Sequence, residues 1–259
     1  MGNRDMTQLK TDISTPTLTF EEYLHYQGKP DVIYELYRGQ LIEMATPSGL
    51  HSRICKFLTS QFERYFVSQD LPLVAMEVTG VQTEDHTSRI PDVLVCSVEL
   101  AERICIRKGA GVFNFDEKPV IVVEVTSDNW REDYIRKRAE YALVNIPEYW
   151  IVDPNKSKIQ VCFNPNNDKG YEDLEFLPGQ DLHSVQFPDF ILPVNRVFSP
   201  PLVTDLIRAE QAERKQLEQR AEDERQRAED ERQRAEDERQ RADRLAQRLR
   251  EMGIDPDAV

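Results

Sequence analysis

The run of residues 120–125 is the segment that most restricts the fold of this chain. Four apolar residues, Val120-Ile121-Val122-Val123, precede Glu124 and Val125, and the run shows no alternation of apolar and polar residues. Such a β-branched run is typical of a strand that is covered on both faces, because a strand with one face in water alternates. It predicts a central strand with helices on both sides of its sheet, which is an α/β fold.

The rest of the first 200 residues supplies the other elements of this fold. Thr19 with Glu22 predicts a capped first helix, and two short segments on either side of Arg38-Gly39 predict a hairpin. Apolar residues recur at helical spacing between Ile54 and Phe66, which predicts a helix of about 18–20 residues. Further strands are expected at 73–83, 93–96, 149–153 and 159–163, and a further helix at 131–144. Together they predict a central mixed sheet flanked by helices.

The chain changes character at about residue 202. The heptapeptide Gln-Arg-Ala-Glu-Asp-Glu-Arg occurs three times in tandem, at 219–225, 226–232 and 233–239. Each repeat places an acid four residues before a base, as in Asp223 and Arg227, and this arrangement stabilises an isolated helix. Alanine is the only apolar residue of each repeat, whereas a stable coiled coil needs two apolar positions per heptad. The repeats therefore predict a long, charged, solvated helix with weak self-association at most.

These patterns predict the organisation of the chain. We expect a flexible N-terminal arm over 1–17, an α/β domain over 18–201, a charged heptad-repeat helix over 202–251 and a short tail over 252–259. Because the helix lacks an apolar seam, any homodimer is expected to form mainly through the α/β domain.

Composition limits the classes of function. The 259 residues carry a formal net charge of −14, which argues against nonspecific coating of nucleic acid because such binding needs clustered Lys and Arg. A small nucleic-acid site remains compatible with this charge. No stretch approaches the roughly 18 consecutive apolar residues of a membrane span. We expect a cytoplasmic protein with no membrane partner, whose four scattered cysteines are reduced thiols without zinc-ligand spacing to a histidine.

Two acids border or interrupt apolar strands. Asp92 directly precedes the strand expected at 93–96, and Glu124 lies near the end of the run at 120–125. An ionised carboxylate in such surroundings is costly unless positive charge compensates it, and a divalent cation can do so. Two acids at adjacent strand ends would suit Mg²⁺ or Mn²⁺. Alternatively, each acid caps its strand or pairs with a basic neighbour.

Lys137 and His51 are candidate partners of these acids. Tyr134, Lys137 and Tyr141 are spaced i, i+3 and i+7, so the lysine shares a helical face with two aromatic residues. Its ammonium could reach the strand ends, or its stem could lie along the core boundary with the ammonium in water. His51 borders the apolar face of its own helix, where it could contact a phosphate or serve as a histidine at the edge of the core.

Several short motifs occur in order over about residues 18–200. They are Tyr34-Glu35-Leu36 with Gly39 and Leu41, Pro47 with His51, Arg89-Ile90-Pro91-Asp92, Val122-Val123-Glu124-Val125-Thr126-Ser127, Asp133 with Lys137 and Tyr141, and Pro147-Glu148-Tyr149-Trp150-Ile151-Val152-Asp153. In this combination the chain resembles the Uma-type restriction endonucleases, which are abundant in cyanobacteria and belong to the PD-(D/E)XK nuclease superfamily. The resemblance implies a restriction-endonuclease-like fold.

The resemblance also implies roles for individual residues. Pro91-Asp92 matches the PD motif and Glu124 matches the acid of the second motif, so both would be ligands of Mg²⁺ or Mn²⁺. Glu35 matches an acid that would hold a water on the metal. Thr126 stands where the superfamily has a lysine, and Lys137 from the following helix is the matching candidate for that role.

The function implied is a metal-dependent endonuclease that hydrolyses DNA phosphodiester bonds by an activated water. His51 and Arg89 are the candidate substrate-binding residues, and DNA is the expected partner, bound over a small footprint. The alternative is a catalytically idle binding or scaffold protein with a nuclease fold, whose C-terminal helix recruits partners. Metal binding distinguishes the two functions, because only the enzyme requires it.

Overall fold

The computed structural model describes residues 17–127, 129–166 and 169–253. The chain divides into two units, Met1–Val203 and Thr204–Val259, and each is described by itself. The arm expected over 1–17 and the tail expected over 252–259 lie almost entirely outside the described residues. Among the helices in the described ranges, none combines the length and the apolar character that crossing a membrane requires.

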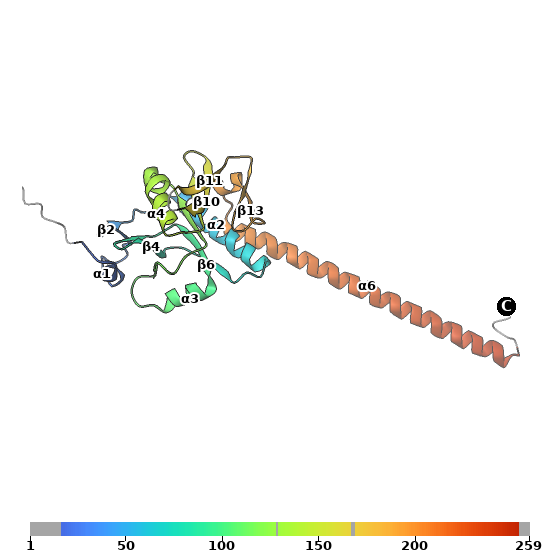
Figure 1. The fold of residues 1–259 in the computed structure, drawn as a ribbon. Helices are drawn as coiled ribbons and strands as arrows, with labels where there is room; N and C mark the ends of the chain where they lie inside the picture. Colours follow the sequence, from blue (N-terminus) through green and yellow to red (C-terminus); the bar gives the residue numbers. More distant parts are fainter. Residues whose placement is uncertain (1–16, 128, 167–168, 254–259) are drawn as a thin grey trace, which may run out of the picture. The chain divides into compact units, whose positions relative to one another are not determined.

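The larger sheet of the first unit is mixed, as the sequence predicts (Figure 1). In spatial order its strands are β11 (Gly170–Phe176), β10 (Lys158–Asn166), β9 (Glu148–Asp153), β8 (Ile121–Val125), β6 (Val93–Ser97) and β3 (Leu73–Met76). Strands β8 and β9 are parallel, and the other neighbouring pairs are antiparallel. Every residue of β8 is buried, which confirms the prediction from its β-branched run.

A smaller sheet carries the N-terminal part of this unit. In spatial order its strands are β2 (Gln40–Glu43), β1 (Tyr34–Tyr37), β5 (Thr87–Arg89), β4 (Gly80–Glu84) and β7 (Val112–Phe113). The predicted hairpin is confirmed, because β1 and β2 pair across Arg38 and Gly39, whose φ angles are 49° and 80°. Two-residue hairpin turns of this kind need positive φ, which glycine adopts without strain. A separate pair is formed by β12 (Asp181–His183) and β13 (Ile191–Pro193).

Helices cover both faces of the larger sheet. The helical segments of this unit are α1 (Phe20–Leu24), α2 (Gly49–Ser68), α3 (Val98–Ile106), the π-helical segment η1 (Glu132–Lys137), α4 (Arg138–Leu143) and α5 (Val194–Phe198). The ring of Phe62 in α2 lies 5.3 Å from Trp150, and the ring of Tyr141 in α4 lies 5.0 Å from Tyr149. Because consecutive strand residues point to opposite faces, α2 and α4 enclose β9 between them.

Two expected elements differ from the structure. The stretch 73–83 divides into β3 and β4, which belong to different sheets, and Val78 at the bend between them has a φ of 55°. The helix expected over 131–144 begins as the π-helix η1 and becomes α-helical only at α4. A π-helical turn accommodates an extra residue, and such turns are frequent at functional sites. In this chain it carries Asp133 and Lys137, both of which are buried.

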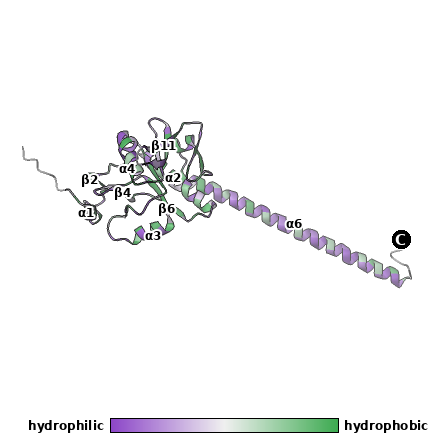
Figure 2. Ribbon diagram, in the orientation of Figure 1, coloured by the Kyte–Doolittle hydropathy of each residue, from purple (hydrophilic) through white to green (hydrophobic). Residues whose placement is uncertain are grey.

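In the part of the second unit that the structure describes, the chain forms one long helix, which confirms the charged helix predicted from the heptapeptides. Helix α6 spans Val203–Glu251, a length of 49 residues, and none of them is buried. Hydrophilic residues predominate along it in Figure 2. The side-chain amides of Gln219 and Gln226 donate to Asp223 and Asp230, at 2.9 and 3.0 Å. Hydrogen bonds between residues four positions apart stabilise a helix that has no core to pack against.

Candidate active site

The topology brings Asp92 and Glu124 to the same edge of the larger sheet. Strands β6 and β8 are antiparallel, with Val93 opposite Val123, so the start of β6 lies beside the end of β8. Asp92 immediately precedes β6, and Glu124 is the penultimate residue of β8. The backbone N–H of Val125 donates to Asp92 Oδ2 at 2.7 Å, which fixes the aspartate against the end of β8.

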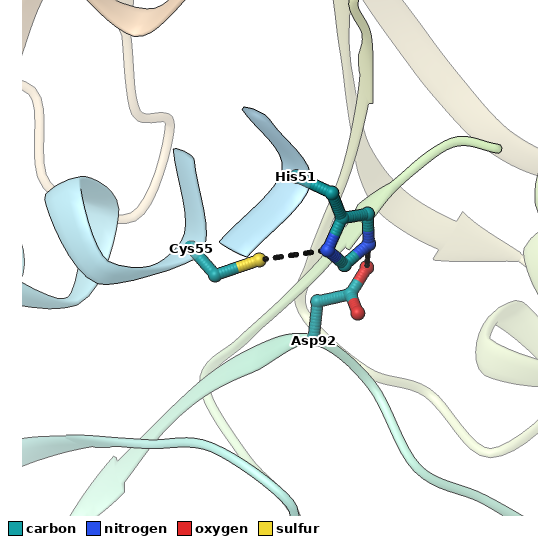
Figure 3. Close-up of side chains that lie close together, drawn as sticks. All are labelled: His51, Cys55 and Asp92. Atoms are coloured by element: carbon teal, nitrogen blue, oxygen red, sulfur yellow. Dashed lines mark hydrogen bonds and ion pairs between the residues drawn. The ribbon is translucent and has the colours of Figure 1, made fainter. Parts of the chain in front are cut away.

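Asp92 also contacts His51, which α2 positions in its first turn. Ser48 caps this helix by accepting a hydrogen bond from the backbone N–H of His51. His51 Nε2 lies 3.1 Å from Asp92 Oδ2, and Figure 3 shows the imidazole between Asp92 and Cys55. Burial alone would lower the pKa of His51, but the hydrogen bond and the negative charge of Asp92 raise it above its ordinary value. Because an ionised carboxylate only accepts hydrogen bonds, Nε2 carries a proton in this contact.

Glu124 is buried, and both of its carboxylate oxygens have partners. Lys137 Nζ lies 2.9 Å from Oε2, and the hydroxyl of Tyr141 donates to Oε1 at 2.9 Å. Burial raises the pKa of Glu124 well above its ordinary value, and nearby Asp92 raises it further, whereas the ammonium of Lys137 opposes the rise. The two contacts hold the carboxyl group in place, while its burial disfavours the charged form.

Lys137 is shared by three carboxylates. Besides Glu124, its ammonium lies 3.6 Å from Glu35 Oε1 and 3.6 Å from Asp133 Oδ1. The side chain is only 10% exposed, so the ammonium reaches the strand ends and does not extend into water. Burial opposes the charged form, but the surrounding carboxylates raise the pKa of Lys137 above its ordinary value. The lysine thus remains protonated at the centre of the acidic cluster.

The sequence left open whether each of the two acids pairs with a basic neighbour, and the structure shows such pairs. Asp92 contacts His51 and Glu124 contacts Lys137, so each acid does have a basic neighbour. The neighbours are too few, however, because Asp133 and Glu35 share the same ammonium, and the arginine that also contacts Glu35 serves two further carboxylates. Negative charge exceeds positive charge at this edge of the sheet.

Arg89 belongs to a neighbouring buried cluster. Its guanidinium donates to both oxygens of Glu140, at 2.6 and 2.7 Å, to Glu132 at 2.9 Å and to Glu35 at 3.2 Å. Its side chain is 3% exposed, and all three guanidinium nitrogens have carboxylate partners. This placement does not agree with the expected substrate contact. Arg89 instead orients Glu35, whose other oxygen accepts from the backbone N–H of Ile90 at 2.9 Å.

Sequence reasoning assigned no role in the site to three residues of this region, although Asp133 was among the motif residues. Asp133 lies one helical turn before Lys137, and Glu140 lies one turn after it, so their spacing was a usable signal. Cys55 lies one turn after His51, and its Sγ is 3.6 Å from His51 Nδ1. The expectation that no cysteine has metal-ligand spacing to a histidine is therefore wrong for this pair, since His51, Cys55 and Asp92 offer ligand atoms that lie within 4.8 Å of one another.

In the absence of a bound ion, the protein should become less stable as the pH rises past about 6.5, the ordinary pKa of an imidazole and well above that of a carboxyl group. Burial raises the folded-state pKa of Glu124 and Asp133, and Asp92 raises that of His51 against the effect of burial. Above this pH the folded protein therefore binds more protons than the unfolded chain, and stability is lost as the pH passes the folded-state pKa values. Melting temperatures of metal-free protein at increasing pH above this value test the sign. A melting temperature that increases with pH would contradict this electrostatic description.

The mixed sheet, the two helices that enclose it and the carboxylates at the ends of β6 and β8 define the class of a restriction-endonuclease-like nuclease fold. A family model described as Uma2, putative restriction endonuclease, matches residues 20–195, and the chain belongs to this family. This confirms the resemblance seen in the sequence motifs.

A solved structure has a fold similar to that of this chain. The crystal structure of a protein from Anabaena variabilis, described as a putative nuclease belonging to DUF820, is similar with a TM-score of 0.55 and 22% sequence identity. The similarity covers 70% of this chain and 98% of that chain. At this level of identity the comparison establishes the fold alone. No curated protein matches this chain.

Proposed function

We propose that this protein is a metal-dependent endonuclease that hydrolyses phosphodiester bonds of DNA by an activated water. The observation that carries the proposal is a cluster of four buried or nearly buried carboxylates, in which Glu35, Glu124 and Asp133 share the ammonium of Lys137 and Asp92 contacts His51. Membership of the Uma2 family supports nuclease activity. Cleavage of duplex DNA with and without Mg²⁺ or Mn²⁺ tests the proposal.

The residues present fit a divalent cation. Burying several carboxylates is costly unless positive charge compensates them. Lys137 is shared by three of them, and Arg89 divides its charge between Glu35 and two carboxylates outside the cluster, so the cluster is not balanced. The donor atoms are carboxylate oxygens, which Mg²⁺ and Mn²⁺ prefer. The buried hydroxyl of Thr126, next but one to Glu124, also has no hydrogen-bond partner among the described residues. Asp92 and Glu124 would hold the ion, and Glu35 would hold a water nearby.

When bound, the ion supplies an activated water and offsets negative charge on the reacting phosphodiester. Lys137 contributes a fixed ammonium, and because the carboxylates around it raise its pKa, it stabilises developing negative charge and does not act as a base. Tyr141 holds one oxygen of Glu124 and His51 holds one oxygen of Asp92. The chain thus orients both acids before a ligand arrives, which lowers the cost of reaching the reactive geometry.

An aromatic and basic surface adjoining η1 supports a small DNA footprint. Lys156 Nζ lies 4.2 Å from the ring centroid of Trp130 and 4.6 Å from that of Tyr134. The guanidinium of Arg131 lies 4.9 Å from the Trp130 ring, and Trp130 is 36% exposed. Tyr134 directly follows Asp133, so this surface adjoins the carboxylate cluster along the chain. Cations provide contacts to phosphates, and exposed rings can stack on bases.

Addition of Mg²⁺ or Mn²⁺ should raise the melting temperature of the wild-type protein, because a ligand that binds only the folded state stabilises it by mass action. Glu124→Gln removes one ligand charge and should show little or no metal-induced shift. The amide can still accept the hydrogen bond of Tyr141, so the variant should fold. Equal metal-induced shifts in the two proteins, measured by calorimetry at the same metal concentration, would remove Glu124 from the proposed ligand set.

The same measurement addresses the scaffold alternative. Helix α6 is a 49-residue helix with no buried residue, and such a surface is compatible with recruitment of a partner. A protein that binds neither Mg²⁺ nor Mn²⁺ and does not cleave DNA would favour this alternative. Homodimerisation through the α/β unit stays a prediction.

A further inference from the structure

His51, Cys55 and Asp92 form a cluster whose chemistry differs from that of the acidic site. His51 and Cys55 both belong to α2, one turn apart, whereas Asp92 belongs to the segment between β5 and β6. Figure 3 shows the three side chains converging, with the imidazole in the middle. Cys55 is a free cysteine and is 6% exposed. The cluster therefore combines a thiol, an imidazole and a carboxylate, while the other residues of the site offer oxygen atoms and one amine.

The spacing of the two helical ligands matches the requirement of a tetrahedral ion. Zinc takes sulfur at about 2.3 Å and nitrogen at about 2.0–2.1 Å, so two such ligands at a tetrahedral angle lie about 3.6 Å apart. Cys55 Sγ and His51 Nδ1 are 3.6 Å apart. One ligand atom from each of the three residues lies within 4.8 Å of the other two. Asp92 contacts Nε2 whereas Cys55 faces Nδ1, so the side chains must rotate before all three bind one ion through a single imidazole nitrogen.

We propose that His51, Cys55 and Asp92 bind a thiophilic divalent transition metal such as Zn²⁺ or Co²⁺. Thiolate and imidazole select such ions over Mg²⁺, which prefers oxygen ligands. Binding forms a metal–sulfur bond and releases the thiol proton to water. Three protein ligands leave a fourth position open to water or another small ligand.

Asp92 belongs to this site and to the proposed Mg²⁺ site, so the two ions compete for one carboxylate. Zn²⁺ is therefore expected to inhibit Mg²⁺-supported cleavage, a consequence that rests on the proposed nuclease function. The binding of the transition metal itself does not depend on that function. The two proposals can consequently fail separately.

Titration of the full-length, metal-free protein with Co²⁺ tests the site directly. A thiolate-to-cobalt charge-transfer band should appear in the near ultraviolet and saturate at one ion per chain, and Zn²⁺ should abolish it by displacement. Cys55→Ser should remove the band, and His51→Gln should weaken Co²⁺ binding by at least about tenfold, the scale of removing a group that holds a metal. Cys105→Ser is the matched control, because Cys105 is also a free cysteine but is exposed, and its band should equal that of the wild type.

Each outcome decides the proposal. Far-ultraviolet circular dichroism checks that the variants are folded, and Cys55→Ala replaces Cys55→Ser if the serine variant does not fold. The absence of a band in the wild type overturns the site, as does a band that persists without the Cys55 thiol or disappears in Cys105→Ser. A normal cobalt spectrum in a protein that cleaves no DNA would support this site and reject the nuclease function.

Discussion

Asp92→Asn is expected to lower Mg²⁺-dependent DNA cleavage by about 10³-fold or more, because a loss of about 4 kcal/mol of transition-state stabilisation corresponds to that factor. The substitution removes the charge of a proposed metal ligand and changes the shape of the side chain very little. The Asn oxygen can still accept the backbone N–H of Val125, which now donates to Asp92 Oδ2 at 2.7 Å. The fold should therefore survive, and the loss should appear in cleavage and in metal affinity.

Asp116→Asn is the matched control, since Asp116 is exposed and lies in the turn before β8. The control should cleave at the wild-type rate, and both variants should melt close to the wild type without metal. Single-turnover cleavage at several Mg²⁺ concentrations separates weaker metal binding from a slower chemical step. If Asp92→Asn retains wild-type cleavage at every Mg²⁺ concentration, Asp92 is not a ligand and the proposed site is incorrect.

Local patterns were sufficient to predict the framework that positions these residues. A β-branched run without alternation is a property of one short segment, and it correctly located β8 as a buried central strand. The helical spacing of apolar residues located α2, which spans Gly49–Ser68. Both patterns can be recognised in a single sequence because each depends only on which faces of one helix or strand are buried.

The local patterns did not predict which side chains of the site contact one another. The sequence placed Lys137 on a face with Tyr141, but both a buried and a solvated ammonium satisfied that pattern. The bend at Val78 and the π-helical turn of η1 depend on contacts between elements, so the local periodicity of apolar residues does not predict them. The same holds for Arg89, because Glu140 is 51 positions away in the sequence and only the packing of α4 against β5 in the folded chain brings the two together.

Arg89→Ala is expected to lower the free energy of unfolding by about 3–5 kcal/mol, the effect of removing one partner from a buried ion cluster. The guanidinium is 3% exposed and contacts Glu35, Glu132 and Glu140. Without it, Glu35 and Glu140 would remain buried with fewer hydrogen-bond donors, and Glu35 would have only the shared ammonium of Lys137 to neutralise it. For a unit of this size the melting temperature should fall by about 6–20 °C, at about 2–4 °C per kcal/mol.

Arg136→Ala provides the control for this effect, because Arg136 contacts the same Glu132, at 2.9 Å, but its side chain is 58% exposed. An exposed pair of this kind contributes about 0.3–0.5 kcal/mol, so the control should melt within about 2 °C of the wild type. Arg89→Lys should recover only part of the lost stability, since an ammonium cannot donate to both oxygens of Glu140 and to two further carboxylates in the fixed geometry of a guanidinium. If the melting temperature of Arg89→Ala equals that of Arg136→Ala, the buried Arg89 cluster is not what holds Glu35 in place, and the orientation of Glu35 must come from the backbone N–H of Ile90 and from Lys137.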